Sequence, residues 1–196
     1  RIMHVITGLD TGGAEKMLTD LAIANHRAGD PPFLVSLLPG GAYYESLAKA
    51  GIPVRDVGLV RGKPSLRGLL RLTNLIRSNK PDIIQSWMYH ADLYSLIALI
   101  FSGRWSKTRL YWGIRCSNMD TTQYGLTLKM VIRVCALLSF LPDGIVANSV
   151  EGRNWHLRIG YKPKLFTVID NGLDVSLFQT TPSSRRKARA KLGIDK

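Results

Sequence analysis

The chain has 196 residues, 45% of them hydrophobic, which excludes a disordered protein and suits one α/β domain, or one domain with a fragment of a second. Lys and Arg number 27 against 14 Asp and Glu. The resulting net charge of +13 favours anionic partners: nucleic acid, a membrane surface or phosphorylated ligands. The two cysteines, Cys116 and Cys135, lack a zinc-binding spacing and fit a reducing cytoplasm.

Seven short apolar runs predict strands, and most are continuous rather than alternating, which indicates burial on both faces, as in a parallel sheet. They cover residues 2–7, 33–38, 54–57, 83–86, 109–114, 144–148 and 165–169. Helical spacing predicts helices at residues 15–28, 43–50, 66–78, 91–101, 126–140 and 151–159, with Ser65 as an N-cap. The sequence therefore predicts an α/β fold: a Rossmann-like, doubly wound, mainly parallel sheet of about seven strands, with helices on both faces and ligands at one rim.

The pattern changes after residue 169. Asp170, Asn171 and Gly172 form a turn signal, residues 180–184 resemble a linker, and residues 185–192 predict a further helix. We therefore expect an N-terminal domain over residues 1–178. Residues 179–196 are expected to be a linker and the start of a second domain.

The loop after the first strand carries Gly8, Gly12 and Gly13 and leads directly into a helix. Free N–H groups at that helix start, with the positive end of the helix dipole, favour an anion such as a phosphate. A short connection without a ligand is the alternative. The spacing of the three glycines matches neither the dinucleotide-binding pattern nor the P-loop.

Polar and aromatic side chains follow the later strands. Trp87 and His90 stand at the end of the fourth strand, where an aromatic ring could pack on a sugar and a histidine could exchange a hydrogen bond. Arg115 follows the fifth strand, where its forked donors suit a phosphate or carboxylate. The alternatives are a histidine that caps the helix and a surface ion pair.

Asn148 and Ser149 stand at the end of the sixth strand. We expect them either to contact a ligand or to serve as a simple N-cap of the next helix. No metal-ligand cluster, catalytic triad order, pair of carboxylates or RNA-binding signature stands out, so no metal and no specific nucleic acid are expected.

Four motifs in order resemble the N-terminal, acceptor-binding half of a family-4 (group 1) retaining glycosyltransferase. They are Gly12-Gly-Ala-Glu-Lys16, Pro81-Asp-Ile-Ile-Gln-Ser-Trp87, Asn148-Ser149 and Val168-Ile-Asp-Asn-Gly-Leu-Asp174. The chain departs from the family pattern in two places. Asp170 replaces a usual proline, and Trp87 stands where many members carry a histidine, with His90 three residues later.

The resemblance implies a GT-B architecture, in which two Rossmann-like domains enclose the active site. The full-length enzyme would transfer a sugar, with retention, from a UDP- or GDP-sugar to a glycan or lipid-linked acceptor. The missing domain would hold most of the donor, and no cofactor would be needed. Gly12, Gly13, Trp87, Arg115, Asn148 and Ser149 would contact donor phosphate or acceptor, and His90 is the catalytic candidate. This fragment alone would be inactive.

The same resemblance implies a cytoplasmic protein, peripheral at the inner face of a membrane, because lipid-linked acceptors are frequent in the family. No signal peptide or membrane span is expected, since the apolar run at residues 130–141 contains Arg133 and is short. Residues 126–141 are expected either to form a core helix or to enter the lipid interface. A noncatalytic Rossmann-like domain that binds a nucleotide or nucleic acid is the alternative function, and the glycine spacing argues against a nicotinamide-dependent oxidoreductase.

Overall fold

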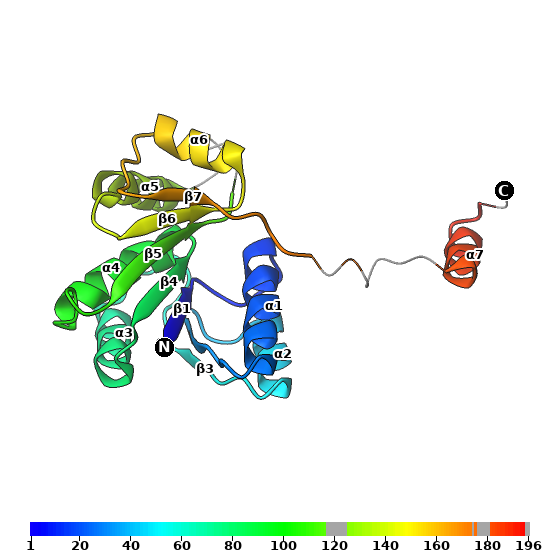
Figure 1. The fold of residues 1–196 in the computed structure, drawn as a ribbon, viewed down its shortest axis with the longest axis horizontal. Coiled ribbons are helices and arrows are strands. Elements are labelled where there is room, and N and C mark those ends of the chain that lie inside the picture. The colour runs from blue at the N-terminus through cyan, green and yellow to red at the C-terminus, as the bar shows by residue number, and fades with distance from the viewer. Residues whose placement is uncertain (117–124, 174, 176–180, 195–196) are drawn as a thin grey trace.

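The computed structural model describes residues 1–116, 125–173, 175 and 181–194. Its centre is one parallel sheet of seven strands in the order β3-β2-β1-β4-β5-β6-β7 (Figure 1). The strands are β1 (Ile2–Ile6), β2 (Phe33–Ser36), β3 (Val54–Asp56), β4 (Ile83–Trp87), β5 (Arg109–Ile114), β6 (Gly144–Ala147) and β7 (Phe166–Val168). The expected Rossmann-like sheet is confirmed, and the strand order reverses between β1 and β4.

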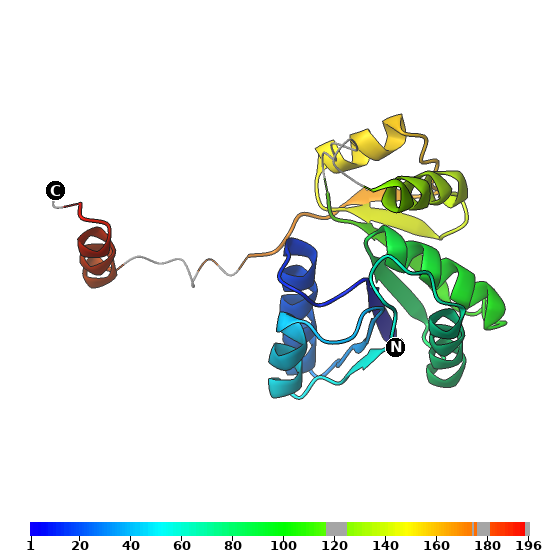
Figure 2. The ribbon, with the colours of Figure 1, turned by 180° about the vertical axis from the view of Figure 1, so that it is seen from behind.

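Each connection within the sheet contains a helix. The helices are α1 (Gly13–Arg27), α2 (Ala42–Lys49), α3 (Leu66–Asn79), α4 (Tyr89–Phe101), α5 (Leu126–Leu138), α6 (Val150–Arg158) and, after the sheet, α7 (Pro182–Lys191). Helices α1 and α2 lie on one face of the sheet, and α3, α4 and α5 lie on the other (Figures 1 and 2). This arrangement follows from right-handed crossovers that run outward in both directions from β1 and β4.

Two apolar cores fill the space between sheet and helices. The smaller one lies under α1 and α2 and includes Leu18, Leu34, Leu47 and Trp87. The larger one lies under α3, α4 and α5 and contains, among others, Ile84, Tyr89, Leu99, Trp112 and Ile145. The continuous apolar runs of β1, β2 and β4 are explained by this arrangement, because each of these strands contributes side chains to both cores.

Most predicted boundaries agree with the structure to within two residues. Ser65 caps α3 as expected, since its Oγ accepts a hydrogen bond from the amide of Gly68 at 3.1 Å. Helix α4 begins at Tyr89 rather than at residue 91, because the chain turns from β4 into the helix within the single residue Met88.

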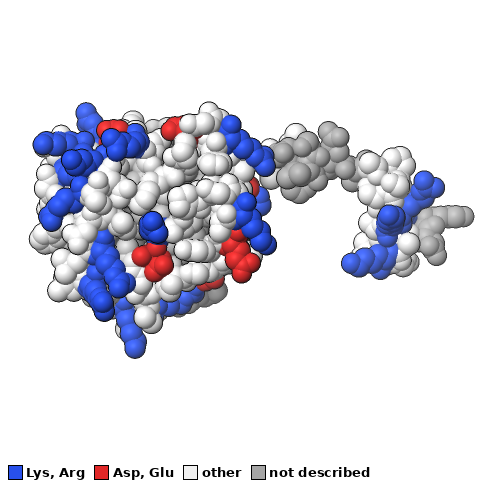
Figure 3. Space-filling view, turned by 90° about the horizontal axis from the view of Figure 1, so that it is seen from below, with Lys and Arg blue, Asp and Glu red and all other residues white. Residues whose placement is uncertain are grey.

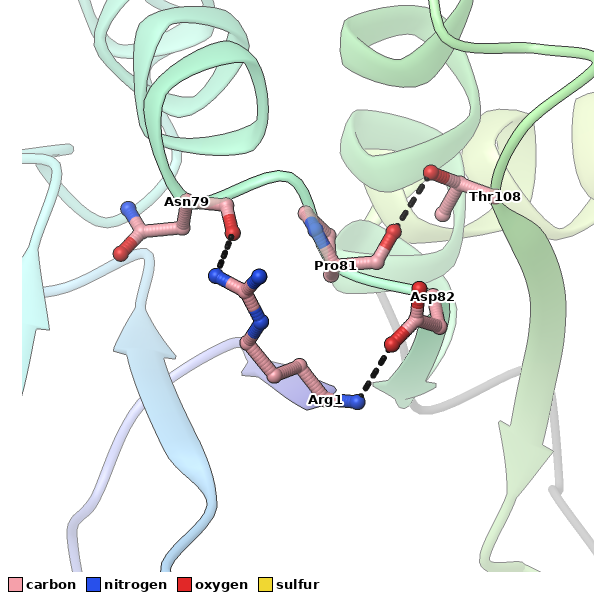
Figure 4. Close-up of polar contacts among 5 residues, drawn as sticks. All are labelled: Arg1, Asn79, Pro81, Asp82 and Thr108. Atoms are coloured by element: carbon pink, nitrogen blue, oxygen red, sulfur yellow. Dashed lines mark hydrogen bonds and ion pairs between the residues drawn. The ribbon is translucent and has the colours of Figure 1, made fainter.

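The amino ends of the central strands are fastened by polar contacts remote from the strand ends where ligands bind (Figure 4). The backbone nitrogen of Arg1 donates to the Asp82 carboxylate at 2.6 Å, and its guanidinium reaches the carbonyl of Asn79 at 3.5 Å. The Thr108 hydroxyl donates to the carbonyl of Pro81 at 2.7 Å. These contacts join the start of β1 to the segments that precede β4 and β5, and we assign them a structural role.

The positive charge is spread over the surface. Figure 3 shows Lys and Arg side chains across the face seen there and far fewer acidic ones. Helix α7 has no buried residue and stands apart from the sheet in Figure 1, with Arg189 and Lys191 in its last turn. None of the described helices is long and apolar enough to cross a membrane. The division into two domains at residue 178 stays a prediction.

Candidate functional site

A pocket of about 530 Å³ opens at the carboxyl ends of the strands, where the strand order reverses. Its walls come from the segments that follow β1, β2, β3, β4 and β5, together with the first turns of α4 and α5. In open α/β sheets this position is where ligands bind, because the chain diverges to both faces there and leaves a crevice. The pocket is therefore the candidate site.

The pocket combines an apolar interior with a few charged groups. Leu37, Leu59, Leu93, Leu128 and Val131 contribute to its walls. Its charged residues are Asp10 and Glu15 near α1 and Arg61 and Lys63 before α3. The Arg61 guanidinium pairs with Asp10 at 3.1 Å, and both side chains are largely exposed, so the pair is worth little in stability. Such a lining suits a ligand with one apolar and one polar part.

His90 lines this pocket from the first turn of α4 and is half-buried. Burial lowers the pKa of His90, so the imidazole is neutral at pH 7 and has one donor and one acceptor nitrogen. His90 is not the helix cap, since Met88 holds that position and α4 has no side-chain cap. Its imidazole is thus available to a ligand in the pocket.

The first loop places Gly12 and Gly13 at the start of α1, as expected. Gly12 is the N-cap, and no side chain caps the helix. A Cβ on Gly12 would lie 2.2 Å from Oε2 of Glu15, whereas a Cβ on Gly13 would meet nothing within 4 Å. The Glu15 carboxylate therefore occupies part of the space before the helix start, and an anion approaching there must displace it. Gly13 leaves the other side open.

Trp87 is buried and does not line the pocket. Its side chain is only 2% exposed, its indole Nε1 donates to Nδ1 of His4 at 3.2 Å, and the guanidinium carbon of Arg115 lies 4.2 Å above its ring. The ring is covered by the core and by Arg115 in this arrangement, and its predicted contact with a sugar stays a prediction. Burial, and secondly the charge of Arg115, lower the pKa of His4 to about 4.

Arg115 is half-buried over Trp87, and its Nη1 donates to Oδ1 of Asn171 at 2.9 Å. Among the described residues it has no carboxylate partner, so the alternative of a surface ion pair does not apply there. Arg115 is not among the pocket residues, although its neighbour Cys116 is. The other N–H groups of the Arg115 guanidinium can donate to a phosphate or to an acceptor sugar. That contact stays a prediction.

Ser149 caps α6, because its Oγ accepts from the amide of Gly152 at 3.0 Å. The N-cap interpretation is confirmed. Oδ1 of the neighbouring Asn148 is buried and has no hydrogen-bond partner among the residues that the structure describes. Neither residue lines the pocket, and neither do Gly12 and Gly13. The structure places His90 in one pocket with Gly8, Asp10 and Glu15 of the β1–α1 region.

Sequence reasoning missed several pocket residues. Glu15 lies two residues after Gly13, and an acidic residue in the first turn of a helix is a recognisable signal. Arg61 and Lys63 lie in a segment without a predicted element, and only the fold brings that segment beside His90. Within the described parts of the chain, no group of three or more His, Cys, Asp or Glu side chains could hold a metal ion.

Comparison with known proteins agrees with the fold. The sequence model of the protein family Glycosyltransferase Family 4 matches residues 11–177 of this chain. The structure of HepE from Anabaena in complex with UDP superimposes with a TM-score of 0.78 at 23% identity, covering 98% of this chain and 50% of HepE. A glycosyltransferase from Rickettsia africae gives a TM-score of 0.66 at 18% identity, covering 100% of this chain and 50% of that chain.

The lipopolysaccharide outer core galactosyltransferase WaaB gives a TM-score of 0.62 at 12% identity, covering 89% of this chain and 46% of WaaB. No curated protein matches the sequence. This chain spans about half the length of the solved structures that it matches. With the family model covering most of its residues and a fold that forms one half of the GT-B architecture, the chain belongs to Glycosyltransferase Family 4.

Proposed function

We propose that this chain is the acceptor-binding half of an enzyme that transfers a sugar, with retention of configuration, from a nucleotide sugar to a glycan or lipid-linked acceptor. The observation that carries the proposal is the pocket at the point of strand-order reversal, with a neutral histidine on its wall. Neutral imidazole can accept a hydrogen bond from a sugar hydroxyl and donate one to another oxygen. His90 thus orients the reacting groups.

The donor is a UDP- or GDP-sugar held mainly by a second domain. HepE was solved with UDP and with UDP and glucose, which supports a nucleotide sugar in the same kind of fold. On this chain, the uncapped start of α1 offers N–H groups to the donor diphosphate once Glu15 has moved aside. Arg115 adds a positive charge at the neighbouring strand end.

The acceptor carries an apolar part beside its sugar. Leucine and valine side chains dominate the pocket interior, and binding a purely polar sugar there would leave its hydroxyls without partners. A lipid-linked sugar meets both requirements, because its apolar chain packs against those walls while its polar end faces His90. The fragment alone is expected to be inactive because it supplies only one wall of the cleft.

The test is transfer by the full-length protein from a panel of UDP- and GDP-sugars to lipid-linked and free sugar acceptors. We expect His90→Ala to lower kcat/KM by about a hundredfold, the usual range for loss of a proton-handling side chain. His26→Ala is the matched control, since His26 is exposed near the end of α1. Wild-type turnover in His90→Ala would refute the role of His90, and absence of transfer from every donor would favour a noncatalytic binding domain.

Peripheral membrane contact is the second part of the proposal, and α5 supports it. One face of the helix packs into the larger core through Ile132 and Cys135. The opposite face exposes Leu126 (79%), Met130 (62%) and Leu137 (74%). An exposed apolar face with basic neighbours is typical of a helix that lies in a lipid interface, and the core and interface interpretations of this segment are compatible.

Vesicle sedimentation tests this contact. We expect the full-length protein to bind vesicles containing phosphatidylglycerol more strongly than neutral ones, because each basic residue near an anionic surface contributes about 1 kcal/mol. The double variant Met130→Ser/Leu137→Ser should lose most of this binding. Leu66→Ser is the control, since Leu66 is equally exposed (73%) but lies at the start of α3. Equal loss in the control would contradict a specific role for α5.

A further inference from the structure

The turn between β4 and α4 contains an unfavourable backbone conformation. Met88 has φ 74° and ψ 156°, a combination that is essentially confined to glycine. Among the described residues, Lys80 is the only other non-glycine residue with positive φ, and it has the ordinary left-handed geometry of a helix end. The strained residue directly precedes the helix turn that carries His90.

The side chains of β4 alternate between the two faces of the sheet, and this alternation changes at Met88. Ile84 belongs to the larger core, and Trp87 belongs to the smaller core on the opposite face, as the pleat requires. In a continuing strand, Tyr89 would point to the same face as Trp87. Instead it lies in the larger core with Ile84. The alternation is reversed at Met88, within the single residue that has the positive φ.

The Tyr89 hydroxyl is held in this position from two sides. It lies 2.8 Å from Nε2 of His156 and 2.9 Å from Sγ of Cys116. Nδ1 of His156 lies 2.6 Å from the carbonyl of Gly152, which can only accept, so Nδ1 carries the hydrogen and Nε2 accepts from Tyr89. Burial lowers the pKa of His156 to about 4, which keeps this ring neutral. Tyr89 thus ties the start of α4 to α6.

Backbone contacts complete the turn. The amide of Met88 donates to the carbonyl of Gly113 at 3.0 Å, and the amide of Asp92 donates to the carbonyl of Met88 at 3.0 Å. The Ser86 hydroxyl lies 2.6 Å from Oδ1 of Asp92, joining the end of β4 to the first turn of α4. Helix α4 therefore starts without an intervening loop, and His90 reaches the pocket for that reason.

We propose that Tyr89 is a positioning residue for His90. The contacts of the Tyr89 hydroxyl with His156 and Cys116, here called the clamp, hold the neighbouring Met88 in its strained backbone conformation. When these contacts are lost, Met88 leaves that conformation, because it is unfavourable for any residue other than glycine. Without the clamp, the strain in Met88 is relieved by rotation of the turn, and the first turn of α4 shifts away from the pocket. The effect on sugar transfer rests on the proposed function, whereas the effect of Tyr89 on the position of His90 does not depend on that function.

The test is a cycle of variants in the full-length protein. Tyr89→Phe removes the clamp and keeps the ring. Met88→Gly and Met88→Ala both remove the methionine side chain, but only glycine is free of strain at this φ. We expect Tyr89→Phe to disturb His90 in the wild-type and Met88→Ala backgrounds and to leave it in place in the Met88→Gly background. Tyr161→Phe is the control, because Tyr161 packs on the same His156 ring but follows α6.

The first readout is the pH titration of the His90 imidazole by NMR, assigned with His90→Gln. The pKa of His90, lowered by burial, should move toward its ordinary value in Tyr89→Phe and return in Met88→Gly/Tyr89→Phe. The other ionisable side chains that line the pocket are present in all these variants, although Cys116 loses its contact with the Tyr89 hydroxyl in Tyr89→Phe. They are Asp10, Glu15, Arg61, Lys63, Tyr94 and Cys116. The second readout is kcat/KM, which should fall roughly tenfold in Tyr89→Phe and recover with glycine, as expected for a small misplacement.

Equal effects of Tyr89→Phe in the Met88→Gly and Met88→Ala backgrounds would overturn the proposal, because they would show that the hydroxyl and the strain are not coupled. An unchanged His90 titration in Tyr89→Phe would do the same. If the wild-type protein transfers no sugar, the proposed function fails while the NMR titration still decides the position of His90.

Discussion

Gly113 and Gly13 show how differently two glycines near one rim are constrained. A Cβ on Gly113 would lie 2.4 Å from the carbonyl oxygen of Ser86, a backbone atom that cannot turn aside. A Cβ on Gly13 would enter open space. Gly113 is therefore required by strand packing beside the Met88 turn, whereas Gly13 is free to serve a ligand.

Gly113→Ala should lower the free energy of unfolding by about 2 kcal/mol, because the strands must separate to admit the methyl group. Gly13→Ala should raise it by about 0.5 kcal/mol, since alanine lowers the entropy of the unfolded chain and fits a helical position. Urea unfolding of both variants measures the difference. A stable Gly113→Ala protein would show that β4 and β5 adapt more than this geometry implies.

Gly13→Trp separates folding from ligand approach at the same position. A Cβ at this position meets nothing within 4 Å, so we expect the melting temperature to change little. If the donor diphosphate approaches the start of α1, the indole blocks it, and the KM of the full-length protein for the nucleotide sugar should rise. The comparison with Gly13→Ala controls for loss of glycine, and an unchanged KM would remove this loop from the donor site.

At the scale of an element, α6 is defined at its start by Ser149 and is tied to α4 through His156. A serine cap satisfies one of the free N–H groups at a helix start. In the cap the Ser149 Oγ only accepts, so its O–H hydrogen is still available to donate to a ligand. Its predicted role in binding and its observed role as a cap can be separated by substitution.

Ser149→Ala should destabilise the protein by about 1 kcal/mol, the usual cost of losing a cap, and Ser149→Asp should restore the cap. Thermal unfolding measures both changes. If Ser149 serves only as a cap, Ser149→Asp also restores transferase activity in the full-length protein. Restored stability without restored activity would instead place the hydroxyl in the binding site.

At the scale of the whole molecule, three buried ionisable groups give stability a pH optimum. His4 and His156 have pKa values lowered to about 4, mainly by burial, from an ordinary value of 6.5. Burial raises the pKa of Asp92 to about 8 from an ordinary 3.8, although hydrogen bonds from Ser86 and Gly113 oppose the shift. The unfolded chain therefore takes up protons at the two histidines on acidification, and loses one at Asp92 as pH rises.

We expect the free energy of unfolding to fall as pH drops from 6.5 toward 4. In this range His4 and His156 stay neutral in the folded protein but become protonated in the unfolded chain, which favours unfolding. Between pH 6.5 and 8 it should fall as pH rises, by up to about 1.4 kcal/mol per pH unit, because folding keeps the Asp92 carboxyl protonated. Thermal unfolding across pH 4–9 measures both slopes. Asp92→Asn should flatten the alkaline slope and steepen the acidic one, because between pH 4 and 6.5 the Asp92 carboxyl opposes the effect of the two histidines. An unaltered alkaline slope would exclude Asp92 as its source.

The sequence alone was sufficient to predict the sheet, the helices and the rim on which the site lies. Apolar runs, helical spacing and capping signals are local properties, and Ser65 and Ser149 act as their own short segments indicate. The glycine loop and His90 were found because residues after parallel strands must gather at one rim. Family membership followed from short motifs in a fixed order.

The tertiary structure alone decided which rim residues share a pocket. Trp87 and His90 are three residues apart, yet the Met88 turn buries Trp87 in one core and directs His90 to the pocket on α4. Arg61 and Lys63 reach the same pocket from a distant loop that has no sequence signal. After a one-residue turn, the face to which a side chain points depends on which of the two cores its neighbours pack into. Both cores exist only when the sheet and its helices have come together, so the local sequence does not determine that face.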